Sequence, residues 1–200
     1  MKIKNFSKFF EEVFLGKKPL LLLDTSAIIE FEKKQKAFLE SILKKEGIVF
    51  VSEGVMEEVE AHRNIMINSH KRELSEKTYE LVKSAYEKSP KILEKILPFV
   101  AIPYEEISEK VCTIIQELPK KRTEDEMSII DANFIVNVLI FYSAIHQAKE
   151  RLPTSLVALT GDEKHIIRPL VKLRDDYFPN KNNLYIIRSR EDKHGHYIRY

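Results

Sequence analysis

The sequence predicts an α/β domain with a mainly parallel central sheet of about five strands flanked by helices. Short continuous apolar runs, such as LLLL at 20–23, are typical of strands that are covered on both faces. Longer tracts with apolar residues at helical spacing separate these runs, and this alternation favours a parallel sheet. The chain contains only 5 Gly and 8 Pro in 200 residues, which favours a helix-rich fold over a sandwich of short strands.

The elements follow in order along the chain. Residues 1–18 are expected to form an amphipathic helix, because their phenylalanines recur at helical spacing. The predicted strands share short apolar runs and are expected at residues 20–23, 47–51, 99–102, 155–160 and 183–188. The predicted helices share helical apolar periodicity and are expected at residues 26–46, 53–88 with a break near 68–69, 91–97, 104–118, 123–151 and 163–175.

The chain has no internal repeat and no low-complexity linker, so we expect one main domain over residues 19–188. The tract 62–97 is interpreted as a helical insertion within that domain. Residues 1–18 are expected to be an N-terminal helical extension, and residues 189–200 are expected to be a polar, basic tail.

Composition narrows the class of protein. The net charge is only +2, and the single cysteine, Cys112, excludes a disulfide framework and a Cys-rich zinc site. The charged N-terminus lacks the apolar centre of a signal peptide. The longest apolar stretches, 19–23 and 135–145, fall short of the roughly 20 residues that cross a bilayer. We therefore expect a soluble, cytoplasmic protein.

Acidic residues follow three of the predicted strands. Asp24 directly follows the first strand, Asp162 follows the 155–160 strand after one glycine, and Glu58 lies in the first turns after the second strand. In an open parallel sheet, ligands bind beyond the carboxyl ends of the strands, so these acids are candidate ligands for one site. The structural alternative for each strand-end Asp is a helix cap or an Asx turn.

Helix geometry ranks the acids after the second strand. Apolar residues define one buried stripe on the predicted helix, with Glu57 nearly opposite and Glu58 and Glu60 flanking it. Glu58 is nearer to the strand end and is the preferred candidate, with Glu60 second. The alternative is that all three are surface charges.

Asp131 lies on a predicted helix that is apolar nearly all round. A buried carboxylate must be protonated, hydrogen-bonded, ion-paired or metal-bound, and no Lys or Arg lies three or four residues away. A distant Arg, or a cap on a helix that begins near Ser128, are the structural alternatives. Glu124 shares the face of Asp131, about 10.5 Å along the axis, so it would line the rim or hold a second ion. Asp125 points away from that face.

Four carboxylates at one site repel each other unless a cation lies among them. Oxygen ligands select Mg²⁺ or Mn²⁺, and such ions activate water for phosphodiester hydrolysis. Ser26 and Thr160 carry hydroxyls beside Asp24 and Asp162, where they would either orient a water or phosphate or cap helices.

Four segments resemble, in order, the acidic blocks of the PIN-domain nucleases. These blocks are LLLLDTSAII (20–29), VSEGVMEEVEAH (51–62), SIIDANFIVNVL (128–139) and VALTGDEKH (157–165). The resemblance implies a PIN-like nuclease domain over 19–188, with acids Asp24, Glu58, Asp131 and Asp162 and hydroxyls Ser26 and Thr160. The spacing between Asp131 and Asp162 is wide for this family. Glu124 or Asp125 is therefore an alternative to Asp131 as the third acid.

The resemblance also implies an activity and partners. PIN domains use Mg²⁺ or Mn²⁺ to cleave RNA, usually single-stranded, and many are dimers. The expected function is therefore a metal-dependent endoribonuclease that binds RNA, forms a homodimer and is regulated by an antitoxin or another protein. The candidate RNA-binding residues are basic and are Lys71, Arg72, Lys120, Lys121 and Arg122. Tyr197 and Tyr200 are candidates for base stacking, and an ordinary solvated surface is the alternative for all of these residues.

Three rival functions remain. A catalytically inactive PIN-like scaffold or RNA-binding module would have the same fold. A metal-dependent phosphatase of the haloacid-dehalogenase type needs a second Asp two residues after the first, and this chain has Ser26 there. A receiver-like module would need adjacent acids and a suitably placed lysine, which the sequence lacks.

Overall fold

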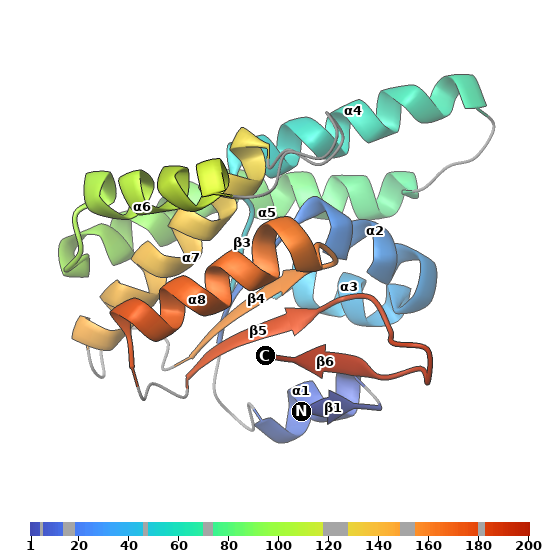
Figure 1. Cartoon of the computed structure of the whole chain (residues 1–200). Coiled ribbons are helices and arrows are strands. Elements are labelled where there is room, and N and C mark those ends of the chain that lie inside the picture. The colour runs from blue at the N-terminus through green and yellow to red at the C-terminus, as the bar shows by residue number, and fades with distance from the viewer. Residues whose placement is uncertain are drawn as a thin grey trace.

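A computed structural model describes residues 1–4, 6–13, 19–45, 48–69, 74–117, 128–148, 155–179 and 183–200. These residues form a sheet with helices packed on both faces (Figure 1). The predicted α/β class is therefore confirmed. The termini meet at one edge of the sheet, where the amino group of Met1 donates to the Arg199 carbonyl at 2.8 Å.

The sheet is mixed and mostly parallel, with the strand order β1-β6-β5-β4-β2-β3. Its parallel part consists of β3 (Val49–Phe50), β2 (Leu20–Leu23), β4 (Leu156–Thr160) and β5 (Leu184–Arg188). Two antiparallel strands extend it at the β5 edge: β6 (Tyr197–Arg199) and β1 (Lys2–Ile3). Thus the carboxyl ends of β2, β3, β4 and β5 lie along one edge.

The helices that flank the sheet are α1 (Phe6–Val13), α2 (Thr25–Lys34), α3 (Lys36–Leu43), α4 (Glu53–Ser69), α5 (Glu76–Ile96), α6 (Tyr104–Glu117), α7 (Ile129–Ala148) and α8 (Arg168–Tyr177). A 3₁₀ turn, η1 (Leu97–Phe99), follows α5, and a π-helical turn, η4 (Glu163–Ile167), leads into α8.

Alternating side chains of the parallel strands supply two apolar cores. In β2, Leu21 and Leu23 belong to a core with α1, α2 and α3, whereas Leu20 and Leu22 belong to a core with α6, α7 and α8. This division follows from the two-residue side-chain period of a strand. Both faces are buried, as the unbroken LLLL run predicts.

The predicted strand at 99–102 is wrong. Leu97–Phe99 form η1, and the residues that follow remain outside the sheet. Prolines at 98 and 103 bracket this run, and a proline cannot donate a ladder hydrogen bond. Phe99, Val100 and Ile102 instead pack, partly buried, against the core beside α7.

Two predicted helix boundaries also change. The helix predicted at 26–46 divides at Gln35, whose φ of −137° and ψ of 38° are not helical. The separate helix predicted at 91–97 is the end of α5, which continues through Pro90. Ser89 links this part of α5 to the residue directly after β3, because its hydroxyl accepts from the Val51 N–H at 3.0 Å. The same hydroxyl donates to the Ala85 carbonyl at 3.0 Å.

Both ends of the chain differ from expectation. The first residues form β1 before the expected helix, and the expected tail forms β6. Tyr197 is almost fully buried, so its predicted role in base stacking is wrong; its ring lies 5.3 Å from that of Phe6. Tyr200 is partly exposed.

The predicted domain boundaries stay a prediction.

Helix α7 is long and apolar enough to cross a membrane by length and composition alone, and it is longer than the apolar stretch expected from the sequence. Its most apolar window is 61% buried inside the fold. It packs against α6, β4 and α8. This burial is typical of the core helix of a globular domain.

Replacing Phe6 tests the contribution of the N-terminal segment to the core. The Phe6 ring lies 4.8 Å from Phe38 and 5.1 Å from Phe31 and has no solvent exposure. Phe6→Ala should lower the free energy of unfolding by about 3–5 kcal/mol, because it removes a buried ring and leaves a cavity. Urea denaturation measures the change, and the exposed Lys4→Ala is the control. A change below about 1 kcal/mol for Phe6→Ala would contradict the packing described.

Candidate metal centre

Acidic side chains from four separate segments approach the carboxyl edge of the parallel strands. Asp24 follows β2, and Asp162 follows β4 after Gly161. Glu58 lies in α4, which follows β3, and Asp131 lies in the first turn of α7. The strands β3, β2 and β4 are neighbours, so the topology itself directs these segments to one place.

Asp24 is the most buried of the four acids, with 4% exposure. It occupies the N-cap position of α2 but makes no side-chain capping bond, so the capping alternative does not account for its carboxylate. Burial raises the pKa of Asp24 to about 6; hydrogen bonds from Ser26 and Thr160 oppose that rise, and the charges of Asp131 and Glu58 add to it.

The two predicted hydroxyls hold the Asp24 carboxylate. Thr160 donates to Asp24 Oδ2 at 2.8 Å, and Ser26 donates to the same oxygen. Ser26 also accepts from the Gly161 N–H at 2.7 Å, and Thr160 accepts from the Asp162 N–H at 3.0 Å. The hydroxyls therefore join the ends of β2 and β4.

Gly161 makes this junction possible. A Cβ atom at this position would lie 3.1 Å from Ser26 Oγ and 3.1 Å from Arg190 Nε. Contacts this short would force the hydroxyl network or the arginine to move. The Arg190 side chain itself pairs with Glu30, with 3.2 Å between Nε and Oε1.

The burial pattern of α4 agrees with the geometry predicted for its acids. Glu57 is exposed, whereas Glu58 is partly buried and accepts a 2.5 Å hydrogen bond from the Thr25 hydroxyl at the start of α2. Glu60 accepts from the Tyr79 hydroxyl at 3.1 Å, on the side of α5. Of these three acids, Glu58 is therefore the one that faces the Asp24 segment.

Asp131 is partly buried and has a capping role. Its Oδ2 accepts from the Ser128 N–H at 3.0 Å, and its own N–H donates to Ser128 Oγ at 3.0 Å. This reciprocal capping box realises one of the alternatives foreseen from the sequence. No Arg or Lys pairs with Asp131 among the described residues. Burial raises its pKa, Ser128 opposes the rise, the charge of Asp162 adds to it and His165 counters it.

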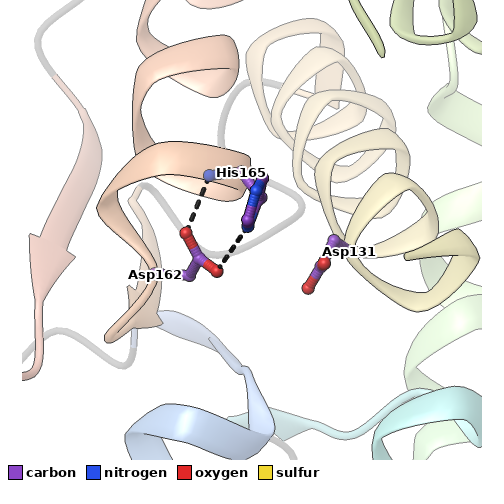
Figure 2. A group of neighbouring side chains, drawn as sticks. All are labelled: Asp131, Asp162 and His165. Carbon is purple, nitrogen blue, oxygen red and sulfur yellow. Dashed lines mark hydrogen bonds and ion pairs between the residues drawn. The ribbon is translucent and has the colours of Figure 1, made fainter. Parts of the chain in front are cut away.

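Asp131, Asp162 and His165 form a group that could hold a metal ion (Figure 2). One ligand atom from each lies within 4.8 Å of the others. Asp162 caps η4, since its Oδ1 accepts from the His165 N–H at 2.7 Å, and its Oδ2 lies 3.0 Å from His165 Nδ1. The capping alternative therefore holds for Asp162, which also orients the imidazole.

His165 is the residue that the sequence interpretation missed. Its signal was its position three residues after a strand-end Asp, which places both side chains on one face of the first turn.

Several predicted residues lie outside the described part of the chain. They are Lys71, Arg72, Lys120, Lys121, Arg122, Glu124 and Asp125. The predicted RNA contacts and the alternative third acid therefore stay predictions.

Comparison of the chain with protein-family models, with curated proteins and with solved structures found no match.

The raised pKa of Asp24 predicts a pH dependence of stability in protein that is free of divalent ions. The folded protein holds this proton more tightly than the unfolded chain does, with a pKa of about 6 against 3.8. The stabilisation is therefore complete below pH 3.8 and is lost as the pH rises through about 6. Asp24→Asn removes the dependence and should raise the unfolding free energy above pH 7 by about 3 kcal/mol relative to wild type.

Denaturant titrations in EDTA at several pH values, for wild type and Asp24→Asn, measure this difference. Glu57→Gln, which replaces an exposed carboxylate on α4, is the control and should parallel wild type at every pH. If Asp24→Asn instead parallels wild type from pH 4 to pH 8, the burial of an uncompensated carboxylate is wrong.

Proposed function

We propose that this chain is a PIN-like, metal-dependent endonuclease that hydrolyses phosphodiester bonds of single-stranded RNA. The observation that supports the proposal most directly is the approach of Asp24, Glu58, Asp131 and Asp162 to one sheet edge. No Lys or Arg among the described residues forms an ion pair with any of them. A cation bound among these carboxylates would offset their mutual repulsion.

The donor set suits a hard or borderline divalent ion. Carboxylate oxygens favour Mg²⁺ or Mn²⁺, and an imidazole nitrogen such as that of His165 suits Mn²⁺ better than Mg²⁺. Asp131, Asp162 and His165 would hold the ion, with Asp24 and Glu58 beside them. When bound, such an ion supplies an activated water and neutralises the charge that develops on the leaving oxygen.

The surrounding residues orient the acids. Ser26 and Thr160 fix the Asp24 carboxylate from one side, and Thr25 holds that of Glu58. Because the pKa of Asp24 is about 6, its carboxylate is largely ionised at neutral pH and is available to a cation. The pH at which a metal binds should therefore reflect the deprotonation of this group.

The rival is a PIN-like scaffold or RNA-binding module without turnover. Its specific support is that Asp131 and Asp162 both cap helices, and these bonds would explain two of the acids without a metal. Capping leaves the buried Asp24 carboxylate unexplained, and for this reason we favour the nuclease. The nuclease proposal includes RNA as the substrate and a cytoplasmic location. It also includes a second copy of the chain and a protein regulator as partners.

A matched pair of substitutions on α4 tests the metal centre. Glu58→Gln should weaken Mn²⁺ binding roughly tenfold or more, since it removes a negative charge beside the ion, whereas Glu60→Gln should not. Isothermal titration calorimetry measures the affinity. Cleavage of a fluorescent single-stranded RNA should require Mn²⁺ or Mg²⁺ and should disappear in EDTA and in Asp24→Asn.

Equal RNA cleavage by wild type and Asp24→Asn would place the activity elsewhere. Absence of both Mn²⁺ binding and cleavage in wild type would favour the scaffold.

Substitutions of Asp131 separate its capping role from its ligand role. The amide oxygen of Asp131→Asn still accepts from the Ser128 N–H, so stability in EDTA should be kept or raised while Mn²⁺ affinity falls. Asp131→Ala should lose the cap as well and cost about 1 kcal/mol of unfolding free energy. Calorimetry and urea denaturation provide the two readouts, and a large loss of stability in Asp131→Asn would identify a purely structural carboxylate.

A further inference from the structure

A cavity of about 540 Å³ lies beside the candidate metal centre. Its walls come from the carboxyl end of β3, the first turns of α4 and α7, the middle of α5 and the start of α6. Glu57 and Ile130 line it, and they directly precede Glu58 and Asp131 in the chain. The cavity and the acids therefore share the N-terminal turns of the same two helices.

The rim of this cavity exposes apolar side chains to solvent. Four large apolar side chains are exposed among the described residues, and two of them, Tyr104 at 50% and Ile129 at 80%, line the cavity. Tyr86 is a second tyrosine in the lining. Exposed apolar groups around a concave site are typical of ligand-binding surfaces, and tyrosine rings are suitable surfaces for stacking a flat ligand.

The polar lining defines the charge of the ligand. Glu53 and Glu57 contribute carboxylates, and no basic side chain lines the cavity in the described part of the chain. Asn133 and Asn137, one turn apart on α7, make no side-chain hydrogen bond to any described residue. A phosphate would be repelled here, whereas a neutral flat group with N–H donors would be bound by carboxylate and amide oxygens.

We propose that this cavity binds a nucleobase that carries an exocyclic amino group. The tyrosine rings stack on the base, Glu57 accepts from the amino group, and the asparagine amides read the adjacent ring edge. The phosphates of the strand remain outside, toward the candidate metal centre. That the base belongs to an RNA chain rests on the proposed function, and the cavity then selects which nucleotide lies near the cleaved bond.

Free nucleosides test the cavity without the metal centre, because they carry no phosphate and the titration is run in EDTA. Adenosine and purine riboside differ only in the amino group. In an NMR titration, adenosine should saturate the chemical-shift changes of the cavity residues at a concentration roughly tenfold lower than purine riboside does. Glu57→Ala together with Asn137→Ala should abolish this difference, and Tyr104→Ala should weaken both nucleosides.

The control is Leu97→Ala, which removes an exposed apolar side chain outside the cavity. It should bind both nucleosides as wild type does, and urea denaturation shows whether each variant is folded. A second readout is the rate of RNA cleavage. Replacing adenosine by purine riboside next to the cut should slow cleavage by wild type roughly tenfold. It should not slow cleavage by the Glu57→Ala, Asn137→Ala variant.

The outcomes distinguish this inference from the proposed function. If Mn²⁺ binding and RNA cleavage are intact but adenosine and purine riboside bind equally or not at all, the base site is wrong and the nuclease stands. If adenosine binds selectively in the cavity but Mn²⁺ does not bind, the nuclease is wrong and the base site stands. Binding of apolar peptides in place of nucleosides would overturn the base site in favour of a protein partner.

Discussion

The candidate site depends on the buried carboxylate of Asp24, which in the described part of the chain accepts hydrogen bonds only from hydroxyl groups. Asp24 ends β2, where the LLLL strand is covered on both faces, so its side chain emerges into the protein interior. Ser26 and Thr160 donate to it, and their other contacts join the β2 and β4 ends. Neutral donors lower the cost of the charge without removing it, and therefore the pKa of Asp24 stays raised, at about 6.

Each of the other acids is held in place by a neighbouring group that also has a structural role. Ser128 fixes Asp131 while the pair caps α7, and Asp162 caps η4 while it orients His165. A capped carboxylate can still accept further bonds, because each oxygen has more than one lone pair. Capping and metal binding are therefore compatible, and the caps would position the acids before any ion arrives.

The sequence was sufficient where a single local pattern decides the structure. The continuous apolar runs predicted β2, β4 and β5. The periodicity around Val55, Met56 and Val59 predicted that Glu57 faces away from the buried stripe of α4. Helix geometry placed Glu58 and Glu60 on either side of that stripe, and Glu58 was preferred because it is nearer to the strand end.

Prediction failed where distant partners decide the outcome. The 99–102 run is as apolar as a strand, yet the flanking prolines and the available surface beside α7 leave it outside the sheet. Strands β1 and β6 are too short for a clear apolar pattern, and they form because each pairs with the other and β6 pairs with β5. The grouping of His165 with Asp131 could not be predicted, because the two residues lie far apart in the sequence and meet only in the fold.

The crossing of α4 and α7 relates the acids to the cavity. A Cβ atom on Gly54 would lie 3.1 Å from Ile130 Cγ1, so the absence of a side chain permits the close approach of these helices. Residues one position apart on a helix differ by about 100° in direction. For that reason Glu57 and Ile130 can line the cavity while Glu58 and Asp131 are directed to the acidic group. The separation between the cavity and the acidic group is thus set by helix geometry and by one glycine contact. A nucleic-acid strand bound across both would have its base and its phosphate held at a fixed separation.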